Sequence, residues 1–143
     1  MPRHRERKVL PYTPEQMFDL IADVERYPEF LPWCIGARVI SRSESAMLAD
    51  LIIGFKVFRE RFTSRVHLER PGHIHVSYIR GPLKYLRNDW RFSPCQENGC
   101  IVDFFVDFEF KNRLFEKLVG ALFSEATRRM IDAFEARALS LYG

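Results

Sequence analysis

The sequence predicts an α+β domain in which a curved antiparallel sheet of about seven strands wraps around a long C-terminal helix. Two observations carry this prediction. Between residues 34 and 110, apolar residues recur with a period of two, in short runs broken by Pro, Gly, Ser and Asn. Residues 112–141 instead carry apolar residues at helical spacing. Packing the apolar face of the sheet against this helix is the simplest way to bury both.

The first elements are a strand and two short helices. Residues 3–10 are charged and then apolar, which predicts a partly exposed strand. Thr13, Pro14 and Gln16 form a helix start, because Thr can cap, Pro suits the first helical position and Gln completes a capping box. Apolar residues at helical spacing follow at Met17, Phe18, Leu20, Ile21 and Val24.

Residues 27–33 form an apolar, aromatic segment bracketed by Pro28 and Pro32. We expect a short second helix or turn there, lying across an open end of the sheet. The segment either plugs the core or forms a lid over a hydrophobic cavity. The chain contains 13 Phe, five Tyr and two Trp, and this aromatic excess favours the lid.

Six further strands are predicted, at residues 35–43, 46–56, 58–70, 73–80, 83–94 and 100–110. The last is the clearest, with Val102, Phe104, Val106, Phe108 and Phe110 on one face. One dry and one wet face are typical of an antiparallel sheet. The helix that follows has an apolar stripe of Phe115, Leu118, Val119, Leu122, Ala126, Met130, Ala133, Phe134 and Leu141.

Length and composition restrict the class of protein. The chain has 143 residues, 47% of them apolar and 29% charged, which excludes a disordered or fibrous protein. We expect one domain spanning residues 1–143, because there is no repeat and no linker. No apolar run approaches the ~18 residues of a membrane span. The charged N-terminus lacks an apolar stretch behind it, and the three Cys form no CxxC motif, so we expect a cytoplasmic protein without a targeting peptide.

Two polar residues interrupt apolar strand faces. Glu60 lies between Phe58 and Phe62, and Asn88 lies between Leu86 and Trp90. A buried carboxylate or amide costs free energy unless it is hydrogen-bonded. Each is therefore either satisfied by a neighbour or holds the polar end of a ligand in an apolar pocket.

Other sequence patterns give only weak evidence for catalysis, metal binding or contact with a polyanion. There is no nucleophile elbow, P-loop or GxGxxG motif, so we expect no catalytic residues. His73 and His75 point the same way on one strand, but no third ligand stands at a telling spacing, so we predict no metal site. The outer sheet face is either a solvated mixed-charge surface or a contact for an anionic membrane or RNA. Its basic residues are Arg59, Arg61, Arg65, Lys84, Arg87 and Arg91.

Several blocks together identify a family resemblance over essentially the whole chain. They are YPEFLPWC at 27–34, GFK at 54–56, RE at 59–60, FTSRV at 62–66, GPLKYL at 81–86 with Trp90 and Phe92, and FEFKN at 108–112. With these blocks the sequence resembles the coenzyme Q-binding family of the START-like, helix-grip superfamily, which is grouped with polyketide cyclase/dehydrase and lipid-transport domains.

The resemblance implies a protein that binds ubiquinone, or a related isoprenoid lipid, in a hydrophobic cavity between the sheet and the last helix. It implies a carrier that supports respiratory electron transport, requires no cofactor besides the bound ubiquinone, and touches the membrane surface transiently as a peripheral protein. We favour a monomer. The expected cavity residues are Phe30, Leu31, Trp33, Leu51, Ile53, Phe62, Val66, Val76, Tyr78, Leu86, Asn88, Trp90, Phe104, Phe108, Leu122 and Met130.

Within that cavity we expect the polar head group to contact Glu60, Tyr78, Asn88 or Tyr85, although strand parity points Tyr85 outward. Phe30, Leu31 and Trp33 are the expected gate.

Two alternatives stay open. The same branch contains ribosome-associated toxins that share these blocks, so the chain could bind a ribosomal subunit through its basic face and inhibit translation. An aromatase/cyclase-like enzyme would need an acid/base in the cavity, for which Glu60 is the candidate.

Overall fold

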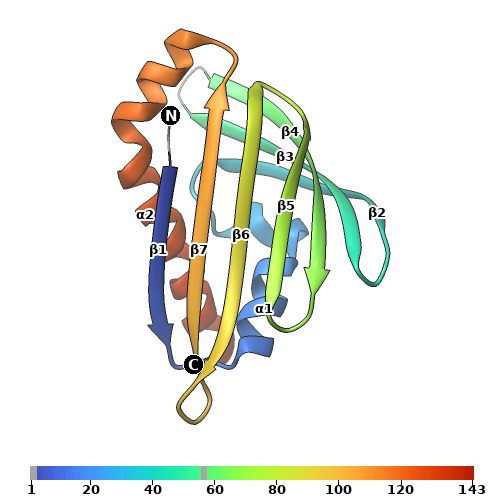
Figure 1. The fold of residues 1–143 in the computed structure, drawn as a ribbon, viewed down its shortest axis with the longest axis vertical. Helices are drawn as coiled ribbons and strands as arrows, with labels where there is room; N and C mark the ends of the chain where they lie inside the picture. Colours follow the sequence, from blue (N-terminus) through green and yellow to red (C-terminus); the bar gives the residue numbers. More distant parts are fainter. Residues whose placement is uncertain (1–2, 56–57) are drawn as a thin grey trace.

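The computed structural model describes residues 3–55 and 58–143, except for the side chains of Phe55, Phe58, Val119, Ala121, Leu122 and Ser124. Seven antiparallel strands form one sheet in the order β1-β7-β6-β5-β4-β3-β2, and the long helix α2 lies against it (Figure 1). The α+β class and the helix-gripping sheet are therefore confirmed. The elements are β1 (Arg3–Leu10), α1 (Pro14–Ala22), the 3-10 helix η1 (Val24–Glu29), β2 (Cys34–Arg42), β3 (Ala46–Phe55), β4 (Phe58–Glu69), β5 (His73–Arg80), β6 (Leu83–Cys95), β7 (Gly99–Phe110) and α2 (Arg113–Tyr142).

Helix α1 begins as the sequence predicts. The Thr13 hydroxyl accepts a hydrogen bond from the Gln16 amide at 3.1 Å, and the Gln16 side chain accepts one from the Thr13 amide at 2.9 Å. These bonds satisfy amides that the first turn leaves without an intrahelical acceptor. The helix buries Met17, Phe18, Leu20 and Ile21.

The second helix begins earlier than predicted. It spans Val24–Glu29 rather than lying within residues 27–33, and it contains Pro28. Val24 is buried, so the first turn is already anchored in the core before the aromatic segment begins. The Tyr27 hydroxyl donates to the carbonyl of Ile21 and ties the helix back to α1.

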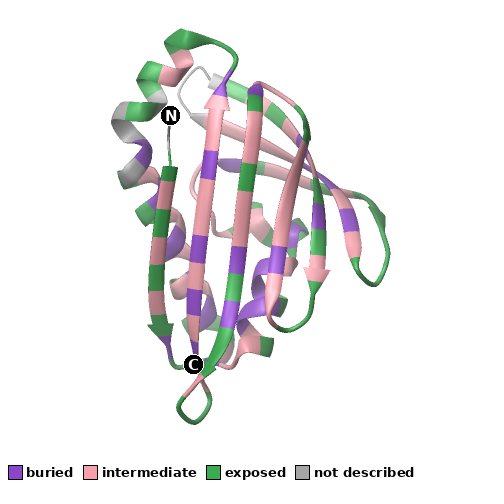
Figure 2. Ribbon diagram, viewed as in Figure 1, coloured by how far each residue is buried: buried purple, intermediate pink, exposed green. Residues whose placement is uncertain are grey.

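Burial changes along the concave face of the sheet (Figure 2). In its lower half most of the inward residues are buried, although Leu68 is half-buried; the buried ones are Met47, Ala49, Val66, Ile74, Trp90, Phe92, Val102 and Phe104. In its upper half the inward residues are only half-buried; they are Ile53, Glu60, Phe62, Tyr78, Leu86, Asn88, Val106 and Phe108. We call this second set the upper floor. At the far rim Leu83 and Phe110 are buried again, and Phe115 of α2 packs 6.1 Å from the Phe110 ring.

Helix α2 begins with Asn112, whose side-chain oxygen accepts from the amides of Leu114 and Phe115. The residues that it buries are Phe123, Thr127, Ile131, Phe134 and Ala138.

The prediction of the apolar stripe is wrong for two residues, because Leu118 is 57% exposed and Leu141 is 52% exposed. Leu118 lies five residues before Phe123, which is about 140° around the helix. Leu141 lies beyond Ala138, the last buried residue, and Tyr142 makes the contact instead, 6.0 Å from Tyr12.

Candidate ligand-binding site

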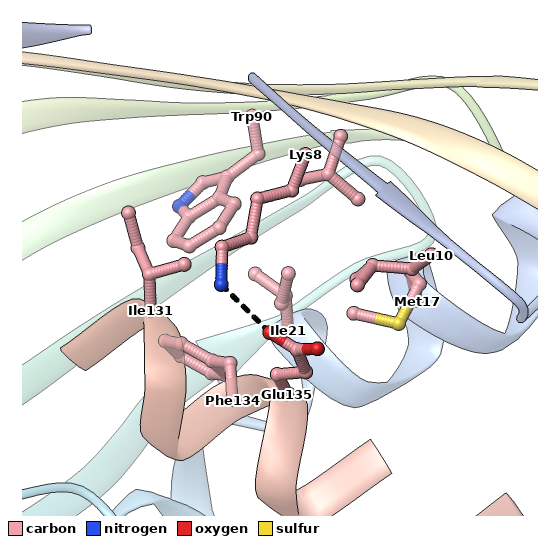
Figure 3. A pocket seen from close by; sticks show the side chains of 9 residues that line it. Lys8, Leu10, Met17, Ile21, Trp90, Ile131, Phe134 and Glu135 are labelled. Atoms are coloured by element: carbon pink, nitrogen blue, oxygen red, sulfur yellow. Dashed lines mark hydrogen bonds and ion pairs between the residues drawn. The ribbon is translucent and has the colours of Figure 1, made fainter. Parts of the chain in front are cut away.

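The lower half of the interior is nearly solid. Between the sheet, α1 and α2 lies a cavity of about 20 Å³ (Figure 3). Such a volume holds about one water molecule, whereas sites for small ligands measure roughly 300–1,000 Å³. A quinone therefore does not fit this cavity. Its lining residues are Lys8, Leu10, Met17, Ile21, Trp90, Val102, Ile131, Phe134 and Glu135.

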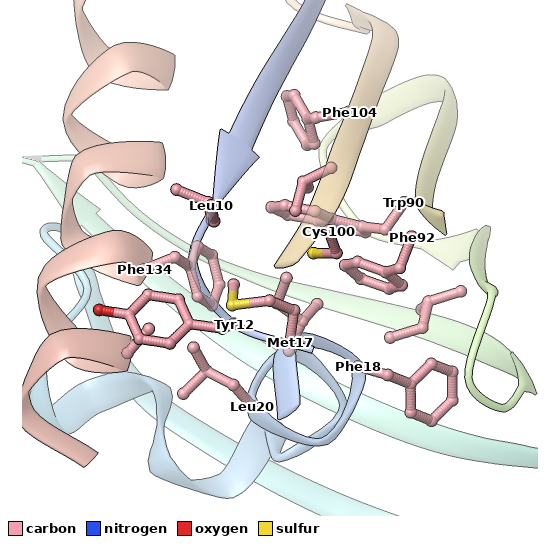
Figure 4. Packing of buried hydrophobic residues seen from close by; sticks show 14 of the residues in the cluster. Leu10, Tyr12, Met17, Phe18, Leu20, Trp90, Phe92, Cys100, Phe104 and Phe134 are labelled. Carbon is pink, nitrogen blue, oxygen red and sulfur yellow. The ribbon is translucent and has the colours of Figure 1, made fainter. Parts of the chain in front are cut away.

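Aromatic rings fill the space where the lower part of the ligand cavity was expected (Figure 4). The Trp90 ring lies 4.5 Å from Phe104 and 5.3 Å from Phe134. Val66 is buried in the same cluster, and Leu51, Val76 and Met130 pack against it. These predicted cavity residues form core contacts in this structure, and only Trp90 among them also lines the small cavity.

The upper floor brings together most of the remaining predicted residues. Ile53, Phe62, Leu86 and Phe108 are half-buried there, on four different strands. Phe108 packs 5.1 Å from the ring of Phe123 in α2. The predicted residue Leu122 lies outside the described side chains. The upper floor is therefore the part of the concave face that keeps partly exposed apolar side chains.

Three polar side chains lie on this floor. Asn88 donates to the carbonyl of Phe105 at 2.9 Å, and the Tyr78 hydroxyl accepts from the Leu83 amide at 2.9 Å. Burial raises the pKa of Tyr78, and the negative charge of Glu60 adds to the rise. Asn88 and Tyr78 thus each satisfy a backbone group of the sheet. Asn88 is in register with Val76 on one side and Val106 on the other, where the buried half meets the open half.

Tyr85 does not belong to this site. Its hydroxyl donates a hydrogen bond to Asp107 at 3.2 Å on the convex face. The Arg3 guanidinium donates to the same carboxylate at 3.3 Å. The expectation that Tyr85 contacts a head group was therefore wrong, for the reason of parity given above.

The segment 27–33 behaves as a plug. The Phe30 ring packs 5.4 Å from Phe134, and the Arg137 guanidinium lies 5.0 Å above Phe30. Arg137 also pairs with Glu29 at 2.8 Å, and the hydrogen bonds from Arg26 and then Arg137 lower the pKa of Glu29. Leu31 packs against the core and Trp33 is half-buried, with its carbonyl accepting from the Gly54 amide. These contacts fix the predicted gate in place.

Sequence reasoning missed three inward polar residues of β1. His4, Glu6 and Lys8 share the face of the buried Leu10, and His4 lies 3.0 Å from Glu6. Lys8 bonds to Glu135 at 2.7 Å, an interaction that raises the lysine pKa. Counting back by twos from Leu10 would have placed all three inside. In register, His4 pairs with Val106, so it flanks the upper floor.

The convex face carries exposed arginines. Arg3 and Arg7 of β1 pair with Asp107 and Asp103. Among the described residues, by contrast, no ion pair involves the exposed set on β4, β5 and β6. This set is Arg59, Arg61, Arg65, Arg80, Arg87 and Arg91. Arg80 joins the convex face because the register shifts between Thr63 and Ser64, which sequence parity did not reveal.

His73 and His75 also lie on the convex face. The sequence offers no third ligand at a telling spacing, but the register of β5 and β6 brings Asp89 opposite His75. The Asp89 oxygen Oδ1 lies 2.7 Å from His73 Nε2 and 2.8 Å from His75 Nδ1.

A family model described as polyketide cyclase / dehydrase and lipid transport matches residues 10–135, most of the chain. The chain belongs to this family. A START superfamily protein of Mycobacterium smegmatis has the same fold, with a TM-score of 0.83 at 17% identity over 97% of this chain and 98% of its own. The START-like fold and the family resemblance are thus confirmed.

Two relatives in the lipid transport family carry different names. The chain is 39% identical over 135 residues to the ribosome association toxin RatA of Rickettsia prowazekii, covering 92% of each protein. It is 36% identical over 144 residues to the mitochondrial coenzyme Q-binding protein COQ10 homolog B of Xenopus laevis, covering 98% of this chain and 59% of that one. Neither name is that of an enzyme. Among the described residues, no helix combines the length and the apolar character that crossing a bilayer requires.

Proposed function

We propose that this protein binds ubiquinone, or a related isoprenoid lipid, over the upper floor and carries it in support of respiratory electron transport from the cytoplasmic side of a membrane. The observation that supports this is the half-buried row of aromatic and aliphatic side chains on an otherwise closed concave face. The name of the COQ10 relative agrees with this ligand. No catalytic role is proposed for Glu60.

In this proposal, contacts to the quinone head group determine which lipid the protein binds. Burial of each CH₂ of an isoprenoid tail gains about 0.8 kcal/mol relative to water, but a bilayer offers the tail the same gain. A flat quinone ring can pack against Phe62 or Phe108. Its carbonyl oxygens need hydrogen-bond donors, and the Tyr78 hydroxyl and the Asn88 amide lie on the same floor.

The first two turns of α2 suit contact with a lipid surface. Leu114 is 63% exposed, Leu118 is exposed as well, and Lys111, Arg113 and Lys117 are exposed beside them. Exposed leucines with flanking cations are typical of segments that rest on anionic membranes. This end of α2 adjoins the rim of the upper floor through Phe115 and Phe110.

The double variant Leu114→Gln/Leu118→Gln is expected to extract ubiquinone from anionic liposomes at least about 5-fold more slowly, because each exposed leucine gains up to roughly 1.5–3 kcal/mol when it enters the lipid surface. Extraction is followed by sedimenting the vesicles and quantifying quinone in the supernatant. The matched control is Leu139→Gln/Leu141→Gln, which alters two exposed leucines at the other end of the same helix. Equal rates for both double variants would contradict the proposed membrane contact.

The ligand itself is tested by mass spectrometry of an organic extract of the purified protein. Co-purified quinone, enriched over the phospholipid of the same preparation, supports the proposal. Purified protein that neither contains quinone nor takes it up from liposomes would overturn it.

A second candidate function is association with a ribosomal subunit, with inhibition of translation. The unpaired arginines of β4, β5 and β6 favour it, as does the name of the RatA relatives. Unpaired cations on one face are what a phosphate backbone attracts.

The variant Arg65→Gln/Arg87→Gln removes two unpaired cations, and both residues are in register with Ser77. If this face binds ribosomal RNA, co-sedimentation with ribosomes weakens, and the slope of log affinity against log salt becomes shallower by about two. The control Arg3→Gln/Arg7→Gln removes two cations that already pair with carboxylates. Co-sedimentation that does not depend on salt would argue against this second function.

A further inference from the structure

A compact set of metal-ligating atoms lies on the convex face, away from the upper floor. One ligand atom each from His73, His75 and Asp89 lies within 4.8 Å of the other two. All three residues are half-buried, so their side chains are held by neighbours yet remain reachable from solvent. One ring nitrogen of each histidine lies within hydrogen-bond distance of the same carboxylate oxygen, so the three groups already stand side by side.

The sheet fixes this convergence. His73 and His75 are two residues apart on β5, and alternate residues of a strand share one face. Asp89 is in register with His75 on the neighbouring strand β6. Each of the three side chains therefore starts from a rigid ladder position rather than from a loop, which reduces the cost of ordering the site on binding.

The donor set matches a borderline transition metal. Two imidazole nitrogens and one carboxylate oxygen are preferred ligands of Zn²⁺, whereas Mg²⁺ and Ca²⁺ require mostly oxygen ligands. Zn²⁺ bonds of about 2.0–2.1 Å in a tetrahedron place ligand atoms about 3.3 Å apart. The two histidine–aspartate spacings of 2.7 and 2.8 Å need to widen by about 0.5 Å, and the two histidine nitrogens, which lie within 4.8 Å of each other, need to settle at the same tetrahedral spacing.

A second carboxylate lies near one of the histidines. Glu69 lies 3.7 Å from Nδ1 of His73, the ring nitrogen opposite to the one that faces Asp89. Metal-bound histidines usually direct their second ring nitrogen to such a carboxylate, which fixes the ring and increases its basicity.

We propose that His73, His75 and Asp89 form a binding site for a divalent transition-metal ion, best suited to Zn²⁺, with water in the fourth position. The exposed Arg91 is in register with His73, and its positive charge opposes the ion. The site is independent of the proposed lipid and ribosome functions.

The test uses the untagged full chain, stripped with a chelator and titrated with Zn²⁺ by calorimetry. We expect one ion per chain, and Co²⁺ in its place should give visible d–d absorption. His75→Gln and Asp89→Asn should each weaken Zn²⁺ binding by roughly 100-fold or more, beyond the 10–100-fold that supporting groups usually contribute. Arg91→Gln should tighten binding a few-fold, because it removes a like charge.

The matched control is His4→Gln, which removes another half-buried histidine that contacts a carboxylate. It should bind Zn²⁺ as the wild type does. Circular dichroism of each metal-free variant checks that the fold is retained, and His75→Gln tests the site if Asp89→Asn does not fold. The proposal is overturned if the wild type binds no stoichiometric Zn²⁺, if folded His75→Gln binds it as tightly as the wild type, or if His4→Gln loses binding equally.

Discussion

Phe134→Ala is expected to lower the free energy of unfolding by about 3–5 kcal/mol, the range found when a buried aromatic ring is truncated. Phe134 is 3% exposed and stands where three parts of the fold meet. Its ring lies 5.4 Å from Tyr27 and Phe30 of the plug segment and 5.3 Å from Trp90 of the sheet. Truncation therefore removes contacts that join α2 both to the sheet and to the plug.

Urea denaturation followed by circular dichroism measures this loss. Leu139→Ala on the same helix is the control, and because its side chain is exposed we expect a change within about 1 kcal/mol. Phe134→Leu should fall between the two, since it retains much of the buried volume. A loss below about 1 kcal/mol for Phe134→Ala would mean that the rings do not hold the helix to the sheet.

Asp50→Ala is expected to cost about 2–3 kcal/mol, because it leaves the buried Thr63 hydroxyl without its charged acceptor. Asp50 and Thr63 are both buried on the convex side of the sheet, 2.6 Å apart, and Arg38 donates to the same carboxylate at 3.1 Å. The Arg38 side chain is exposed, so we assign it little of the effect. Asp103→Ala is the control, because its partner Arg7 is also exposed and the loss should stay below about 1 kcal/mol.

The Asp50 contribution should also depend on pH. The Thr63 hydroxyl, and after it Arg38, lowers the pKa of Asp50 in the folded state. A carboxylate with a lowered folded-state pKa stabilises the fold fully above its unfolded pKa, about 3.9, and loses that stabilisation as the pH falls through the lower folded value. The stability difference between wild type and Asp50→Ala should therefore be constant from pH 7 to about pH 5 and shrink below pH 4. A difference that widens on acidification would contradict this assignment.

Local signals predicted the fold well. The capping box of Thr13 and Gln16 needs only neighbours in sequence, and the alternation along β7 needs only the period of a strand. Neither signal depends on contacts with distant parts of the chain. The strand and helix bounds differ from the prediction mainly at η1, where a buried Val24 begins the turn before the aromatic segment.

The site was harder to predict because it depends on relations between elements. The register shift between Thr63 and Ser64 places Arg80 on the convex face. Simple alternation along β5 would have placed it on the concave face. Asp89 becomes a neighbour of His75 only through the register of β5 and β6. The aromatic excess indicated a ring-lined interior, but composition does not determine whether rings surround a space or fill it. Around Trp90 and Phe134 they fill it.

The inward side chains of β1 have a consequence for self-association. β1 is an edge strand, and the edge of a sheet offers unpaired backbone groups to any other chain that can align with it. His4, Glu6 and Lys8 place polar and charged side chains on the concave face of this edge strand, where an apolar strand would otherwise invite a neighbour. Inward-pointing charged residues on an edge strand are one of the features by which natural sheets discourage open-ended polymerisation.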